Sequence, residues 1–202
     1  MIGRPTVTDA MTDEELVSAF TRGSKEAYTI LVGKYKDPLV NFACRILGDY
    51  DGALDVVQDT FVRLHEKAHT YRHVAKFSTW IYTIASNLAR TELRRRKWGL
   101  SGRKSGSAST MQGPERDVSD PDELPDGRAG RAIAAGKIEK ALNDLPDSFR
   151  EAVVLFYIED MRYEDICRIL GIRMGTLKSR LSRARAMLEE ALRPLMESDE
   201  ID

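Results

Sequence analysis

Two histidines and a glutamate stand at a spacing that can bind zinc. His65, Glu66 and His69 form an H-E-x-x-H pattern, which on a helix places both imidazoles on one face with a carboxylate available as general base. His73 would be a third ligand, but its spacing lacks the glycine-containing interval of the metzincins, and no strands are predicted to line a substrate cleft. We therefore reject protease chemistry and predict no catalytic residue, metal or cofactor.

Cationic side chains are concentrated locally, although the 202-residue chain has a formal net charge of only −1. Residues 115–126 and 197–202 are acidic. Residues 76–104 are strongly basic and hold one acidic residue, Glu92; the cations include Arg90, Arg94, Arg95, Arg96, Lys97, Arg103 and Lys104. Such segregation is more informative about binding partners than the total charge.

A second basic region, residues 163–192, predicts two helices joined by a tight turn. The first is expected over 163–170, and Gly171 favours its end. The second begins near Met174, and its apolar stripe is Leu177, Leu181, Ala184, Leu188 and Leu192. The cations between these positions are Lys178, Arg180, Arg183 and Arg185. This arrangement is typical of a helix-turn-helix that presents a recognition helix to DNA.

Helical periodicity also dominates residues 13–98, where strand signals are scarce. The apolar spacing predicts a short helix around 16–20 and a second helix capped by Ser24. Pro38 is expected to begin a fresh helix, because proline fits a first turn better than a helix interior. A further helix is expected over 52–69.

The last helix of this part is predicted to begin at Ser78, as its cap, and to end at Lys97. Its outer face is expected to carry Ser86, Asn87, Arg90, Arg94 and Lys97. Residues 99–131 are rich in glycine, serine, proline and aspartate, so they predict a flexible linker. Ordered structure is expected to return near Ala132.

These patterns predict an all-α protein of two small helical domains on a flexible linker, the C-terminal domain being the helix-turn-helix. Cys44 and Cys167 lie in apolar patterns without a C-x-x-C motif, so we expect buried thiols. No signal peptide or membrane-spanning run is present, so we expect a cytoplasmic protein. The predicted divisions are a disordered N-terminus (residues 1–12), the first domain (13–98), the linker (99–131), the second domain (132–196) and an acidic tail (197–202).

Five motifs in a fixed order resemble the extracytoplasmic-function (ECF) sigma factors, the compact two-domain group of the sigma-70 family. Each motif alone is weak, but five in order across a linker are specific. In the first domain they are D-x-x-Q-D-x-F over 55–61, and F-x-x-W over 77–80 followed by I-A-x-N over 84–87. In the second domain they are Leu-Pro at 145–146 with Phe-Arg at 149–150, Tyr-Glu-Asp-Ile over 163–166, and Gly-Thr-Leu-Lys-Ser-Arg over 175–180.

The resemblance implies a non-enzymatic bacterial specificity subunit of RNA polymerase. It implies binding to the clamp coiled coil of the largest subunit and to the flap of core polymerase, and control by an anti-sigma factor. The residues that match the polymerase-binding helix are Asp55, Gln58, Asp59 and Phe61. An ordinary solvated acidic face is the alternative explanation for this helix.

The resemblance also implies that the first domain binds and melts the promoter −10 element. Single-stranded DNA binding needs stacking surfaces and a cationic groove. The matching residues are Tyr71, Phe77, Ser78, Thr79, Trp80, Asn87, Arg90, Arg94 and Arg95. The alternative for the aromatic members is that they fill the core. Glu92 stands where the family commonly has aspartate, a minor departure.

The helix-turn-helix is implied to bind the −35 element in the major groove. Residues near the start of a recognition helix reach bases, and later cations reach phosphates. The candidates are Arg173, Met174, Gly175, Thr176, Lys178, Ser179, Arg180 and Arg183. Arg173 stands where the family often has a serine-like cap, which puts the cap geometry in question.

A stand-alone dimeric helix-turn-helix regulator is the alternative function. Such a regulator would bind a palindrome and would have no use for the acidic helix face and the basic helix of the first domain. The first domain therefore favours the sigma-factor interpretation.

Overall fold

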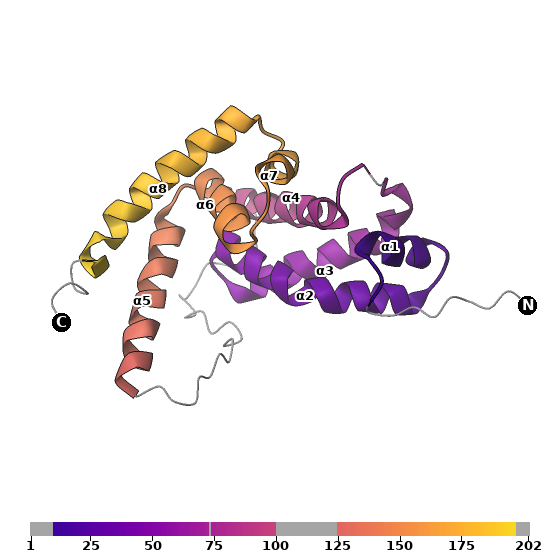
Figure 1. Cartoon of the computed structure of the whole chain (residues 1–202), viewed down its shortest axis with the longest axis horizontal. Helices are drawn as coiled ribbons and strands as arrows, with labels where there is room; N and C mark the ends of the chain where they lie inside the picture. The colour runs from indigo at the N-terminus through magenta and orange to yellow at the C-terminus, as the bar shows by residue number, and fades with distance from the viewer. Residues whose placement is uncertain (1–9, 73, 100–124, 197–202) are drawn as a thin grey trace, which may run out of the picture.

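The computed structural model describes residues 10–72, 74–99 and 125–196, and every regular element within these ranges is a helix (Figure 1). The prediction of an all-α fold with two helical domains is confirmed. The first domain contains α1 (Asp13–Thr21), α2 (Lys25–Leu47), α3 (Tyr50–Lys67), the short 3-10 helix η1 (Ala68–Thr70) and α4 (Phe77–Lys97). The second contains α5 (Pro125–Asp144), α6 (Asp147–Val153), the π-helical turn η2 (Val154–Ile158), α7 (Tyr163–Leu170) and α8 (Met174–Met196).

The first domain is built on the long antiparallel pair of α2 and α3, with α4 packed against both and α1 against α2 (Figure 1). Apolar side chains spaced three and four residues apart form its core, and the larger fully buried ones include Leu31, Leu39, Phe42, Leu64, Phe77 and Ile81. The rings of Phe42 and Tyr82 pack edge to face with centroids 5.3 Å apart. This packing fixes α4, the basic helix, relative to the α2–α3 pair.

Local capping sets several of the helix boundaries. The Thr12 side chain accepts from the backbone of Glu15, whose carboxylate accepts from the Thr12 backbone in return, and this capping box begins α1. Ser24 caps α2, as predicted. Gly48, at φ +75°, and Gly171, at φ +65°, end α2 and α7 in the left-handed conformation that glycine adopts without strain.

Two predicted helix starts are wrong. α2 continues through Pro38 without a break; Pro38 is exposed, so the carbonyl that loses its partner is on the solvent side, while Leu39 and Phe42 are buried and hold the helix in place. Ser78 is not a cap, because α4 already begins at Phe77. The first backbone N–H of α4 donates instead to Oε1 of Glu14 in α1, at 3.1 Å.

The second domain packs α8 against α5, α6 and α7. Leu177, Leu181 and Ala184 form the buried stripe of α8, as predicted. α7 has the predicted bounds 163–170, and α8 has the predicted start at Met174. α5 begins at Pro125, earlier than the predicted return of order near Ala132; proline is favoured in a first turn. Residues 100–124 of the predicted linker, 1–9 of the predicted N-terminal segment and the tail 197–202 lie outside the described residues.

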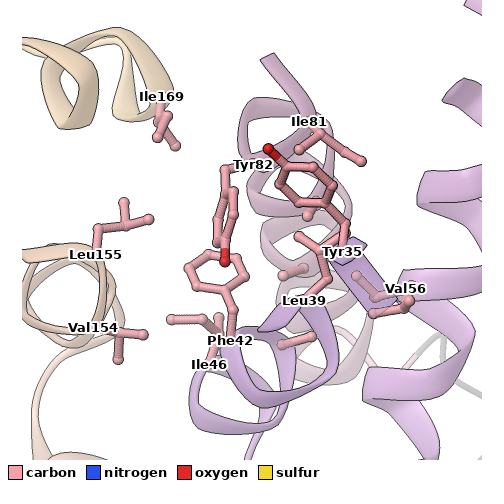
Figure 2. Packing of buried hydrophobic residues seen from close by; sticks show 14 of the residues in the cluster. Tyr35, Leu39, Phe42, Ile46, Val56, Ile81, Tyr82, Val154, Leu155 and Ile169 are labelled. Atoms are coloured by element: carbon pink, nitrogen blue, oxygen red, sulfur yellow. The ribbon is translucent and has the colours of Figure 1, made fainter. Parts of the chain in front are cut away.

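The two domains are in direct contact, which the sequence does not predict. α7 packs on α4, and α6 packs on α2 (Figure 1). Figure 2 shows Val154, Leu155 and Ile169 of the second domain facing Tyr82 and Phe42 of the first. All belong to one buried cluster, so the hydrophobic core is continuous across the domain boundary.

Phe42→Ala should lower the free energy of unfolding by about 3–5 kcal/mol, because it leaves a cavity in a packed core. Val62, on the exposed face of α3 with 49% of its surface accessible, provides the control Val62→Ala, which should change stability by less than about 0.5 kcal/mol. Urea unfolding followed by circular dichroism measures both. Equal unfolding midpoints for the two variants would contradict this core assignment.

Candidate polymerase and nucleic-acid interfaces

The acidic face of α3 is on the surface. Asp55, Gln58 and Asp59 are exposed, and Val62 lies on the same face, one helical turn further on. Phe61, predicted with them, is buried at 8% exposure, and its backbone carbonyl accepts from the Tyr28 hydroxyl at 3.2 Å. Three of the four predicted polymerase-binding residues are thus accessible together, while Phe61 belongs to the core.

An aromatic cluster lies where the loop before α4 meets the helix. The ring centroids of Tyr71 and Trp80 are 5.5 Å apart, and those of Phe77 and Trp80 are 5.9 Å apart. Phe77 is fully buried, whereas Tyr71 and Trp80 are half-buried and Ser78 is too. The Tyr71 hydroxyl donates to the Ala75 carbonyl at 2.7 Å. Burial, followed by the charges of Glu14 and Asp13, raises the pKa of Tyr71 to about 12, so its hydroxyl stays protonated.

The predicted DNA-binding face of α4 divides into accessible and occupied residues. Asn87, Arg94 and Arg95 are exposed. Arg90 is half-buried, and its Nε lies 2.8 Å from Oε2 of Glu151 in α6. The Thr79 side chain is buried and donates to Oδ1 of Asp165 in α7 at 3.1 Å.

The prediction that Ser86 points outward is wrong. Ser86 is fully buried, and its hydroxyl donates to the carboxylate of Glu151. The physical reason is the packing of the second domain on α4, which converts this part of the outer face into an interface. Glu151 is a residue that the sequence reasoning missed. Its only signal was a charge within the apolar run of α6.

Arg96, one of the cations of the basic segment 76–104, joins α4 to the α2–α3 corner. Its Nη1 donates to Oδ2 of Asp49 at 2.5 Å and to the Leu47 carbonyl at 3.2 Å, and its Nε donates to Glu92 at 3.1 Å. A Cβ at Gly52 would lie 2.1 Å from Nη2 of Arg96, so a larger residue there would displace the guanidinium from this position. Burial opposes the charge of Arg96, but the bonds to both carboxylates raise its pKa overall.

The start of α8 presents the predicted recognition surface. Met174 and Arg180 are half-buried, and the exposed candidates are Arg173, Gly175, Thr176, Lys178, Ser179 and Arg183. The Arg173 carbonyl accepts from the Leu177 backbone at 3.1 Å, so Arg173 occupies the cap position through its backbone. Further along, Arg185 donates to the Tyr157 hydroxyl at 2.8 Å, and this bond raises the pKa of Arg185.

A groove of about 640 Å³ lies between the domains and joins the two predicted DNA-binding surfaces. Asn87, Arg90 and Arg94 of α4 line one side, and Arg180 of α8 and Glu151 of α6 line another. Residues predicted to bind separate promoter elements are thus neighbours in this structure.

The first histidine of the H-E-x-x-H pattern packs against two aromatic rings. The His65 ring lies 5.4 Å from the Phe20 ring and 5.6 Å from the Tyr28 ring, measured between centroids. Within the described ranges, which leave out His73, no group of three or more metal-ligating side chains is present. No helix of the described ranges has the length and hydropathy that crossing a membrane requires.

Comparison with known proteins defines the class. A model of sigma-70 region 2 matches residues 31–99, and a model of sigma-70 region 4 matches residues 135–188. The chain therefore belongs to the sigma-70 family and, by its relatives, to the ECF sigma factors of RNA polymerase. It is 31% identical to the RNA polymerase sigma-H factor of Pseudomonas aeruginosa over 91% of this chain and 95% of that one. It is 32% identical to the ECF sigma factor SigW of Bacillus subtilis over 86% and 93%.

Solved structures agree with this assignment. The sigma factor RpoE of Bartonella quintana, in complex with the anti-sigma factor NepR, superposes with a TM-score of 0.62 at 28% identity, covering 82% of this chain and 96% of that one. CnrH in complex with the cytosolic domain of CnrY has the same fold, with a TM-score of 0.66 at 23% identity over 90% and 97% of the two chains.

Arg96→Ala is expected to lower the free energy of unfolding by about 1–3 kcal/mol, because charge-assisted bonds to Asp49 and Glu92 are lost at a helix corner. Arg95→Ala is the matched control: the Arg95 side chain is 60% exposed and lies 3.6 Å from Glu92, so its loss should cost less than about 0.5 kcal/mol. Thermal unfolding by calorimetry compares them, and equal losses would refute the role assigned to Arg96.

Proposed function

We propose that the chain directs promoter-specific transcription initiation as a non-catalytic subunit, in the bacterial cytoplasm where polymerase and chromosome are found. It binds core polymerase, places one domain on each promoter element and opens the duplex by holding unpaired bases. The observation that carries this proposal is the pairing, in one chain, of a region 2 domain with an exposed acidic helix face and a region 4 domain with an exposed cationic helix start.

The acidic face of α3 is proposed to dock on the clamp coiled coil of the largest polymerase subunit. Asp55 and Asp59 supply charge, and Gln58 between them supplies an amide that both donates and accepts. Phe61 acts indirectly, because its burial holds α3 in place. The second domain is proposed to contact the polymerase flap.

The loop before α4 and the α4 helix are proposed to bind the −10 element as a single strand. Trp80 and Tyr71 provide half-buried aromatic faces for stacking. The exposed Asn87 amide can donate to and accept from one base edge. Arg94 and Arg95 provide charge for the phosphates. Holding a flipped base costs a few kcal/mol of unstacking, which these contacts offset.

The start of α8 is proposed to enter the major groove of the −35 element. Met174, Thr176 and Lys178 are at the helix start, where side chains reach base edges. Arg183 lies further along the same helix and is assigned to phosphate.

An anti-sigma protein is proposed as the regulatory partner. The RpoE–NepR complex supports this, since RpoE shares the fold at 28% identity and is bound there to its anti-sigma factor. The exposed faces of α3 and α8 are surfaces that such a partner would cover.

Run-off transcription tests the proposal directly. The purified chain is mixed with core polymerase on a library of genomic fragments, and start sites are mapped. We expect a stable complex with core and starts downstream of paired elements at a fixed spacing. A tight homodimer that binds a palindrome and ignores polymerase would overturn the proposal.

Asp59→Lys should weaken binding to core polymerase by at least about tenfold, because like charges across an interface cost several kcal/mol. Asp37→Lys makes the same charge change at an exposed position on α2 and should leave the affinity unchanged. Fluorescence anisotropy with labelled chain measures both. Equal affinities for the two variants would remove α3 as the docking surface.

Asn87→Ala should impair promoter opening more than initial binding, since the amide contacts a base only after strand separation. Lys178→Ala should impair initial binding more than promoter opening. Losing a base contact in the −35 element should cost about 1–3 kcal/mol of binding free energy. Permanganate footprinting reports opening, and mobility-shift titration of holoenzyme reports binding. Full opening by the Asn87 variant would show that this side chain has no such role.

A further inference from the structure

The start of α4 has no cap of its own. The first backbone N–H groups of a helix lack partners within the helix, and a side chain at the preceding position commonly accepts from one of them. In α4 that position is Lys76, which makes no such bond and whose ammonium group can only donate. The N–H of Phe77 donates instead to Oε1 of Glu14 in α1, at 3.1 Å. The helix proposed to bind the −10 strand is therefore capped by another helix.

The loop before α4, of which residues 71–72 and 74–76 are described, has little packing to support it. Three of these residues are exposed: Arg72, Val74 and Lys76. The loop and Glu14 also line an open cavity of about 500 Å³. The Tyr71 hydroxyl donates to the Ala75 carbonyl at 2.7 Å, a bond that closes the loop on itself. Hydrogen bonds rather than a packed core therefore set the path of this loop.

The Glu14 carboxylate acts on both ends of the loop. At the far end it caps α4 through Phe77. At the near end burial and then the charge of Glu14 raise the pKa of Tyr71, which places that charge close to the Tyr71 hydroxyl. The Tyr71 and Phe77 rings meet edge to face, with centroids 5.8 Å apart. One carboxylate thus borders the whole aromatic cluster.

α1 is itself held on α2 by the preceding residue. Oδ1 of Asp13 lies 2.5 Å from Nζ of Lys34, and its Oδ2 accepts from the Tyr35 hydroxyl at 2.5 Å. The buried Tyr35 ring packs edge to face on Phe77, with centroids 5.3 Å apart. Because Asp13 and Glu14 are adjacent, a single turn of α1 joins α2 to the start of α4.

This arrangement bears on strand capture more than on folding. Phe77 is fully buried, so its ring keeps α4 in place when the cap is lost. The loop has no such anchor and becomes free to take other paths. A loop that is ordered beforehand loses less conformational entropy when its ligand binds. Loss of the cap should therefore weaken the hold on an unpaired strand while leaving the fold intact.

We propose that Glu14 is a positioning residue for promoter opening: it caps α4 and fixes the loop before it, so that the faces of Tyr71 and Trp80 are in place before the −10 strand arrives. Glu14 itself does not contact DNA. This inference deepens the proposed function and rests on it for the identity of the ligand. The cap itself rests only on the contacts between α1 and α4.

Two substitutions of Glu14 distinguish the cap from general support of the helix. Glu14→Ala removes the acceptor, whereas Glu14→Gln keeps an amide oxygen that can accept the same bond. Glu15→Ala is the matched control, because it removes an exposed carboxylate from the same turn, one that accepts from the Thr12 backbone and not from α4. Circular dichroism verifies that each variant is folded at the assay temperature.

Permanganate footprinting of holoenzyme measures opening, and mobility-shift titration measures initial binding. We expect Glu14→Ala to reduce the open fraction roughly tenfold, the effect of one lost hydrogen bond to a charged group, with initial binding unchanged. Glu14→Gln should restore most of the opening, and Glu15→Ala should match the unmodified chain. Full opening by Glu14→Ala, or an equal loss in Glu15→Ala, would overturn the positioning role.

Amide hydrogen exchange of the full chain, followed by NMR without polymerase or DNA, tests the cap by itself. The Phe77 amide should exchange faster in Glu14→Ala than in the unmodified chain, and Glu14→Gln should return it toward the original rate. Unchanged exchange in Glu14→Ala would show that no cap exists. Unmodified holoenzyme that opens no promoter would overturn the proposed function, and with it the role of Glu14 in opening, whereas the exchange rates judge the cap in either case.

Discussion

The arrangement of the whole chain depends on two adjacent buried charges in α6. Arg150 donates to the end of α2, and Glu151 accepts from α4, so one turn of the second domain ties together two helices of the first. Burial lowers the pKa of Arg150, with Asp147 and Asp144 opposing, and its Nε is buried without a hydrogen-bond partner. Buried ion pairs repay their desolvation only incompletely. These ion pairs are therefore specific in geometry while adding little net stability.

α4 shows how one helix can meet two demands. Its apolar positions, among them Phe77, Ile81 and Leu88, are buried in the first domain and fix the helix whether or not the second domain is present. Within the described ranges, five of its polar side chains donate to carboxylates of the second domain: Thr79, Tyr82, Ser86, Arg90 and Lys97. Arg96, at the end of the helix, is held by Asp49 within the first domain. Separation of the domains therefore leaves α4 anchored.

Elements whose signals are local could be predicted from the sequence. The bounds of α7 and the start of α8 follow from Gly171 and from apolar spacing, and the exposed face of α3 follows from its charges. The start of α4 could not be predicted, because Glu14 from α1 supplies its cap. Phe61 and Phe77 match binding motifs of the family, and both are buried. A binding motif contains residues that contact the partner and residues that hold the helix in shape. The sequence alone does not separate these two kinds of residue.

Ser86 and Glu151 could not be predicted for a deeper reason. Neither residue has an unusual local sequence, and their hydrogen bond forms only because segments on opposite sides of the linker come into contact.

That contact also has a thermodynamic consequence. If closure and DNA compete for Arg90, the coupling is reciprocal: DNA favours the open form by the same free energy by which closure disfavours DNA. Any ligand that binds the two forms equally well leaves the equilibrium unchanged. If α3 docks on polymerase as proposed, a partner that covers α3 alone blocks that docking without drawing the two domains together.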